Sequence, residues 1–216
     1  MDALDQKVFN QFQKMIEATM STGENCAEHI VTAAERIASA LLSGNKIFTC
    51  GDQSGALVAQ LLTDYLLLGY DIDRPGFPSL NLNQMTPASG HGQYYNQTLN
   101  THAESGDILV LLSAGNCNPK LLGALNTAVS KGMTVVLLSA ENDDSLINAV
   151  SYNDVHIEIG AGPLPLTTQS QLQIVQCLCA LIDSHILEEN KCVNRSHHFQ
   201  WSVVLPAASF LPAAPL

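Results

Sequence analysis

The chain has 216 residues, of which 46% are hydrophobic and only 13% are charged. This composition excludes an intrinsically disordered chain, and the length suits one domain. Nine basic residues against 20 acidic ones give a formal charge of −11 with no basic run, which disfavours direct binding to nucleic acid.

The sequence lacks the signature of a signal peptide or a membrane span. The first twenty residues carry five charged side chains, and no apolar stretch reaches the roughly 20 residues that spanning requires. The six cysteines include no CxxC pair and lie mostly in apolar runs. We therefore expect a cytoplasmic protein with reduced core thiols, without a cofactor or a metal site.

The first 42 residues are predicted to be helical. Residues 5–42 divide into two helices with a break at 21–23, where Ser, Thr and Gly follow one another. The second helix has an apolar face made by Ile30, Ala34, Ile37 and Leu41, which recur every three or four residues. This face is expected to pack on the rest of the domain.

Strand-like runs and helical segments alternate after residue 45. Strands are predicted at 46–50, 79–82, 107–113, 133–139 and 154–159, helices at 55–69, 118–131, 144–150 and 167–188, and a polar segment at 90–104. Several strands are apolar throughout, which is typical of a parallel sheet covered on both faces. We expect an α/β fold: a three-layer αβα sandwich with a five-stranded, mostly parallel sheet plus the N-terminal helices. Residues 1–190 would form this domain, and 191–216 a C-terminal tail of unknown role.

Two polar loops follow the first and third predicted strands, at 52–55 and 114–118. Ligands of open parallel sheets bind at the carboxyl ends of the strands, and exposed backbone N–H groups at a helix start favour an anion. Asn118 before Pro119 is a good helix N-cap. Asp52 would repel a phosphate unless its side chain turns away to cap the following helix. The predicted ligand-binding residues are Gln53, Ser54, Ser113, Asn116 and Asn118.

Five fragments in order carry a resemblance to a known family: LLSGNKIFTCG, DRPGFPSLNLN, SGDILVLLSAGN, AVSKGMTVVLLSA and CLCALID. Over roughly residues 5–188 the chain resembles the sugar isomerase (SIS) domain family. Within the family it is most similar to phosphoheptose isomerases and to DiaA-type regulators of the replication initiator DnaA. The resemblance implies a phosphosugar-binding cleft and a homo-oligomer, most simply a tetramer that buries the N-terminal helices between subunits.

The chain departs from the isomerases at the positions that carry their chemistry. Leu61 and Tyr65 stand where the isomerases place a His and a Glu that act as acid/base and metal ligand, and Gln176 replaces a further His. The first loop reads GDQSG instead of a Gly-Asn-Gly-Gly-Ser-like sequence, and residues 113–118 read SAGNCN instead of Ser-x-Ser-Gly-Asn-Ser. Isomerisation needs a general base. Leucine cannot act as one, and a tyrosine phenol could only donate.

The helix after the first loop is expected to bury this face. Leu57, Leu61, Tyr65 and Leu68 recur at helical spacing, so they are predicted to be core residues. Asp64 lies about 100° round the helix and is expected on the surface. His91 and His102 are interpreted as surface or capping residues. We therefore predict no catalytic residue.

The leading hypothesis is a non-catalytic, oligomeric SIS-domain protein of the DiaA type that acts as an adaptor for DnaA. The resemblance places Ile186 and Leu187 at an apolar pair that contacts DnaA. The other interpretation is that both residues pack under the tail or against a second subunit. The alternative function is a divergent phosphoheptose isomerase, acting on sedoheptulose 7-phosphate, or a sugar-phosphate sensor without turnover.

Overall fold

The computed structural model describes residues 2–85, 94–115, 118–160 and 162–196, with side chains as far as residue 186. Within these ranges five strands form one sheet, in the order β2-β1-β3-β4-β5, and every neighbouring pair is parallel. The strands are β1 (Ile47–Gly51), β2 (Ser79–Asn81), β3 (Ile108–Leu112), β4 (Thr134–Ser139) and β5 (Val155–Glu158). The predicted parallel α/β sheet is confirmed.

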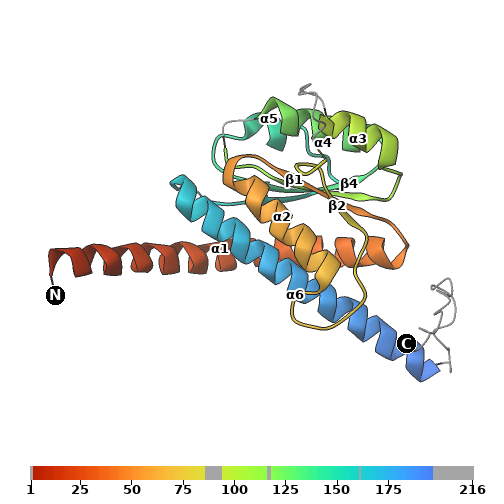
Figure 1. Cartoon of the computed structure of the whole chain (residues 1–216), viewed down its shortest axis with the longest axis horizontal. Helices are drawn as coiled ribbons and strands as arrows, with labels where there is room; N and C mark the ends of the chain where they lie inside the picture. The colour runs from red at the N-terminus through yellow and green to blue at the C-terminus, as the bar shows by residue number, and fades with distance from the viewer. Residues whose placement is uncertain (1, 86–93, 116–117, 161, 197–216) are drawn as a thin grey trace, which may run out of the picture.

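Helices cover both faces of the sheet (Figure 1). They are α1 (Ala3–Leu42), α2 (Gln53–Leu68), α3 (Tyr94–His102), α4 (Pro119–Ser130), α5 (Asp144–Ile147) and α6 (Leu164–Ser196). Residues of α1, α2 and α6 form the core on one face, and residues of α3, α4 and α5 form the core on the other. This is the three-layer sandwich that the apolar strands predicted.

The central strand β3 shows why these strands are apolar throughout. All five of its residues are buried. Val110 and Leu112 belong to the core beneath α1, α2 and α6, whereas Leu109 and Leu111 belong to the core beneath α3 and α4. Alternate side chains of a strand point to opposite faces, so a sheet covered on both sides needs an apolar residue at every position.

The N-terminal region is one helix of 40 residues, so the predicted break at 21–23 was wrong. Thr22 donates a hydrogen bond from Oγ1 to the Ala18 carbonyl at 2.8 Å, and the same atom lies 3.0 Å from Ser170 Oγ on α6. Packing against α6 thus holds the helix at the predicted break. The face predicted for the second half is confirmed, because Ile30, Ala34 and Ile37 are buried.

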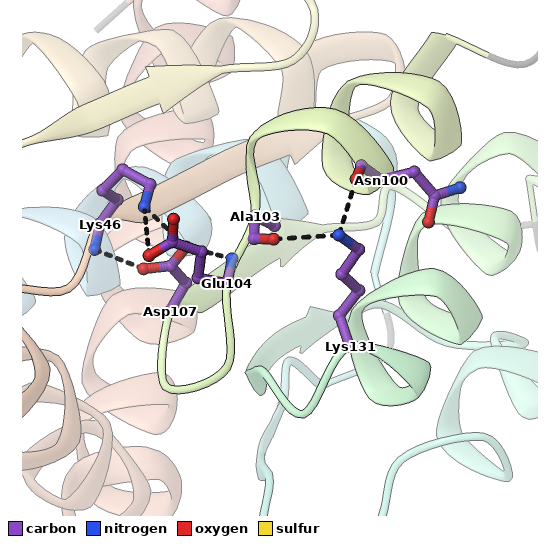
Figure 2. A network of polar contacts seen from close by, with 6 residues as sticks. All are labelled: Lys46, Asn100, Ala103, Glu104, Asp107 and Lys131. Atoms are coloured by element: carbon purple, nitrogen blue, oxygen red, sulfur yellow. Dashed lines mark hydrogen bonds and ion pairs between the residues drawn. The ribbon is translucent and has the colours of Figure 1, made fainter.

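Polar contacts brace the amino edge of the sheet (Figure 2). The buried Asp107 carboxylate accepts the N–H groups of Lys46 and Glu104, each at 2.8 Å, and pairs with Lys46 Nζ at 3.2 Å. Lys131 Nζ donates to the Asn100 and Ala103 carbonyls at the end of α3. The Asp107 contacts thus hold the start of β1 beside the start of β3, and the Lys131 contacts join the end of α4 to the end of α3.

The last helix is longer than predicted. The pattern indicated residues 167–188, whereas α6 begins at Leu164 and ends at Ser196. It therefore includes the first residues of the segment interpreted as a tail, and the rest of that segment, 197–216, lies outside the described residues. Among the helices that the structure describes, none combines the length and apolar character needed to cross a bilayer.

Candidate functional site

The first predicted loop joins β1 to α2. Gln53 is exposed and has a φ of 44°, in the left-handed region that non-glycine residues seldom adopt. Ser54 is half-buried, and its Oγ lies 2.6 Å from Thr168 Oγ1 on α6. Strained backbone of this kind is concentrated at ligand sites and tight turns, which agrees with the position of this loop at the carboxyl edge.

Two glycines bring this loop against β3. A Cβ on Gly51 would lie 2.5 Å from the Gly55 carbonyl carbon, and a Cβ on Gly55 would lie 2.7 Å from the Leu112 carbonyl oxygen. The Asp52 N–H also donates to that oxygen, at 3.2 Å. The start of α2 therefore sits directly on the end of β3, and the two loops are neighbours.

The second predicted loop follows β3. Ser113 is fully buried, and its Oγ accepts the Gly115 N–H at 3.3 Å, so this hydroxyl closes the turn. Asn118 is the N-cap of α4, as predicted, because its Oδ1 accepts the Lys120 N–H at 3.0 Å. Asn116 lies outside the described residues. The geometry brings the Asn118 side chain to the first loop, through Asp52.

Asp52 connects the two loops. It occupies the N-cap position of α2, yet its side chain makes no capping hydrogen bond. Instead Oδ1 accepts the Ala114 N–H at 2.8 Å, and the Asn118 side chain hydrogen-bonds to the same carboxyl. Asp52 is 8% exposed. Burial raises its pKa above the ordinary 3.8, the two hydrogen bonds oppose that rise, and the nearby Asp143 carboxylate adds to it.

A polar layer lies beneath the loops, and sequence reasoning missed it. Asn83, just after β2, accepts the Gly51 N–H at 3.0 Å and donates to the Gly51 carbonyl at 2.8 Å. Its Nδ2 also lies 2.7 Å from the Tyr95 hydroxyl. Burial, with Cys50 and Asp52 adding to it, raises the pKa of Tyr95 to about 12. The position of Asn83 at the end of a strand, on the ligand edge, was a signal that could have identified it.

Gln171 on α6 is a second residue that sequence reasoning missed. Its side chain is fully buried and donates from Nε2 to the Ser113 carbonyl at 2.7 Å. Its Oε1 is buried without a hydrogen-bond partner among the described residues. This oxygen faces the start of α2, since a Cβ on Gly55 would lie 3.4 Å from it. An acceptor is therefore available between the two loops.

The outward face of α2 corrects the prediction that this stripe is core. Leu57 is 70% exposed, Leu61 is 37% exposed and Leu68 is 79% exposed. The core is filled by the opposite face, including Val58, Ala59, Leu62 and Leu66. Asp64 is half-buried and accepts a hydrogen bond from Gln60 Nε2 at 2.8 Å. The fourth residue of the predicted stripe, Tyr65, is half-buried and packs against the core, whereas the described chain leaves the three leucines exposed.

Another possible catalytic pair consists of Ser139, the last residue of β4, and His156, the second residue of β5. Ser139 Oγ and His156 Nε2 are 2.6 Å apart. Burial lowers the pKa of His156, which favours the neutral imidazole. Ser139 is fully buried, however, and a nucleophile must reach its substrate. We interpret this pair as a structural hydrogen bond that joins the two strands.

Four residues considered in the sequence remain: Ile186, Leu187, His91 and His102. Ile186 is half-buried and packs against the core beneath α1, α2 and α6. Leu187 belongs to α6, with its side chain outside the described residues, and His91 is also outside them. His102 is exposed at the end of α3, consistent with its interpretation as a surface residue. Within the described residues no group of three or more His, Cys, Asp or Glu side chains could hold a metal ion.

Comparison with known proteins gives the family. The model of the SIS domain family matches residues 11–140, more than half of the chain. A phosphoheptose isomerase from Shewanella piezotolerans is 27% identical over 193 residues, which cover 86% of this chain and 98% of that protein. An uncharacterized protein from Haemophilus influenzae is 29% identical over 186 residues, which cover 82% of this chain and 95% of that protein.

Solved structures give the same fold. The phosphoheptose isomerase from Francisella tularensis superimposes with a TM-score of 0.74 at 24% identity, over 85% of this chain and all of that one. The phosphoheptose isomerase from Neisseria gonorrhoeae has a TM-score of 0.75 at 19% identity, over 84% of this chain and all of that one. The family match, the parallel sheet and the loops at its carboxyl edge agree. The chain belongs to the SIS domain family.

Proposed function

We propose that this chain is a non-catalytic SIS-domain protein of the DiaA type, an oligomeric adaptor for the replication initiator DnaA. The observation that supports the absence of catalysis is the outward face of α2, where the isomerases have their acid/base pair. Leu61 is partly exposed there and cannot transfer a proton. Tyr65 is half-buried and packs edge-on against Tyr70, with ring centroids 4.9 Å apart.

The exposed side chains of α1 support the oligomer. The first half of α1 projects beyond the rest of the molecule (Figure 1). It exposes an apolar stripe: Leu4, Val8, Phe9, Phe12, Ile16 and Met20, each at least 56% exposed. An apolar surface of this size on a helix is typical of an interface. We propose that α1 of a second copy covers it, in a tetramer with two-fold symmetry.

The DnaA contact would lie at the end of α6. Ile186 and Leu187 occupy the matching positions, and acidic Glu188 and Glu189 follow them in the sequence. The overall charge of −11 favours a basic partner, because charges steer association while apolar residues anchor it. Ile186 is partly buried against the core, which favours a structural role for that residue. Substitution of Ile186 can therefore disprove the proposed DnaA contact.

The second candidate function is a divergent phosphoheptose isomerase. This function is favoured by the similar proteins: several that are 26–27% identical over 86% of this chain are called phosphoheptose isomerases. For this chain the isomerase activity would need a proton-transfer group other than Leu61.

Turnover separates the two candidates. Purified protein is incubated with sedoheptulose 7-phosphate, and the product is followed by NMR, with the Francisella tularensis isomerase as the positive control. We expect no conversion above the background of a mock purification. Conversion that is lost on Tyr65→Phe would show an active enzyme and overturn the non-catalytic proposal.

The adaptor role is tested by pull-down with purified DnaA. The double variant Ile186→Ala, Leu187→Ala should lose DnaA while it retains the oligomer mass, with only a small decrease in Tm from the truncation of half-buried Ile186. The double variant Leu57→Ala, Leu68→Ala is a matched control, because it removes two exposed leucines from α2. Loss of the oligomer in the first variant would instead make Ile186 and Leu187 structural residues.

A further inference from the structure

The Asp52 carboxylate takes up hydrogen-bond donors that an incoming anion would need. Its Oδ1 lies 2.8 Å from the Ala114 nitrogen, in the loop after β3, although Asp52 itself follows β1. The Asn118 side chain hydrogen-bonds to the same group. The carboxylate therefore bridges the two loops at the carboxyl edge, where a phosphate of a bound ligand would make the same kind of contact.

The direction of this side chain is unusual for its position. An aspartate at an N-cap usually accepts an N–H from the first turn of its own helix. Asp52 has the extended backbone of an N-cap but makes no such contact with α2. Its carboxylate reaches across to Ala114, 62 residues further along the chain. The contact thus joins the loops instead of capping the helix.

The surrounding backbone leaves little freedom for the bridge to open. The Asp52 N–H is bonded to the Leu112 carbonyl, and Gly55 approaches that same carbonyl closely enough to exclude a Cβ. The carboxylate is almost wholly buried. A phosphate that entered between the loops would meet this carboxylate at hydrogen-bonding range, and Asp143 lies near enough to influence Asp52 as well.

We propose that Asp52 is the specificity-determining residue of this site: its carboxylate stands in for the anionic group of a ligand and excludes phosphate monoesters. The inference rests on the two loops being the ligand site of the proposed function. It concerns the charge of the ligand and is independent of turnover. The positions at which the isomerases transfer protons are different residues, Leu61 and Tyr65 on α2.

Two substitutions separate charge from contact. Asp52→Asn removes the charge and keeps an oxygen that can accept the Ala114 N–H. Asp52→Ala removes both, and frees the Ala114 and Asn118 donors. Asp64→Asn is the matched control, because it makes the same change of net charge at a half-buried aspartate on α2 that accepts a hydrogen bond from Gln60 of its own helix.

The test measures binding of inorganic phosphate and of sedoheptulose 7-phosphate by isothermal titration calorimetry on the full chain. We expect the wild type and Asp64→Asn to bind only weakly, with a Kd above about 1 mM. Both Asp52 variants should bind more tightly by roughly tenfold or more, as expected when a like charge about 4 Å from the anion is removed. Circular dichroism confirms that each variant is folded.

Two results would overturn the inference. One is wild-type binding as tight as that of Asp52→Asn, which would show that the carboxylate does not oppose phosphate. The other is folded Asp52→Asn and Asp52→Ala variants that bind no better than Asp64→Asn. Neither result bears on the non-catalytic proposal, which fails only if the wild type converts the substrate.

Discussion

Arg74 and Asp183 form an ion pair that is withdrawn from solvent. Arg74 Nε lies 2.7 Å from Asp183 Oδ1, and the two side chains are 8% and 5% exposed. Arg74 also donates to the Leu66 and Tyr65 carbonyls at the end of α2, and its guanidinium lies 3.8 Å from the centre of the Phe77 ring. One side chain thus ties α2 to α6 and adds hydrogen bonds to two carbonyls at the end of α2, each of which also accepts a backbone N–H.

Removal of one partner of this pair should be costly. Asp183→Ala leaves the Arg74 guanidinium buried and unpaired, so we expect a loss of about 3–5 kcal/mol in the free energy of unfolding. The control is Glu104→Ala, which removes an ion pair to Lys46 in which Glu104 is 80% exposed. That change should cost at most about 1 kcal/mol. Urea unfolding measures both, and equal losses would contradict the assignment of Arg74–Asp183 as a structural brace.

At the scale of elements, α1 shows how tertiary contacts override local signals. Glycine inside a helix is less favourable than alanine by roughly 0.8–1 kcal/mol, which is why residues 21–23 predicted a break. The helix continues through Gly23, and Thr22 packs against Ser170 of α6 at the same place. Packing along one helix therefore outweighs a local preference of this size.

Two of the helical glycines, Gly23 and Gly55, should respond in opposite ways to alanine. A Cβ on Gly23 would meet no atom within 4 Å, so Gly23→Ala should raise the free energy of unfolding by about 0.5–1 kcal/mol. A Cβ on Gly55 would lie 2.7 Å from the Leu112 carbonyl oxygen, so Gly55→Ala should destabilise the protein. Thermal unfolding of the two variants measures the contrast. A destabilised Gly23→Ala would indicate that α1 is bent at this point.

At the scale of the whole molecule, the described chain leaves two apolar surfaces uncovered. One is the stripe on the projecting half of α1, and the other consists of Leu57, Leu61 and Leu68 on α2. Burial of a phenylalanine or leucine side chain contributes about 1.5–3 kcal/mol, so a few such residues can hold an oligomer together. The proposed assembly gives the α1 stripe a partner from a second copy.

Charges placed in the α1 stripe should dissociate this assembly. The double variant Phe9→Asp, Phe12→Asp should elute with the mass of the 23.2 kDa monomer, whereas the wild type should have a multiple of that mass. Val129→Asp is the control, because it places one charge of the same sign at an exposed apolar residue on α4. Multi-angle light scattering across micromolar concentrations gives the masses. A monomeric wild type would refute the assembly.

The sequence by itself determined the order of the elements, the parallel sheet and the two loops at its carboxyl edge. Apolar runs, helical spacing and an Asn-Pro cap are local patterns. Each predicts an element formed by residues that are close together in the sequence. The face of α1 that packs on the sheet was predicted for the same reason, since Ile30, Ala34 and Ile37 lie on one side of a helix.

Only the tertiary structure decided what those patterns contact. Periodicity shows that Leu57, Leu61 and Leu68 share a face, but burial depends on whether another element covers that face. The sequence placed Asp52 in a ligand loop, yet its hydrogen-bond partner is 62 residues away. The physical reason is the same in both cases: hydrogen bonds and burial between distant segments depend on the folded arrangement, which no local pattern contains.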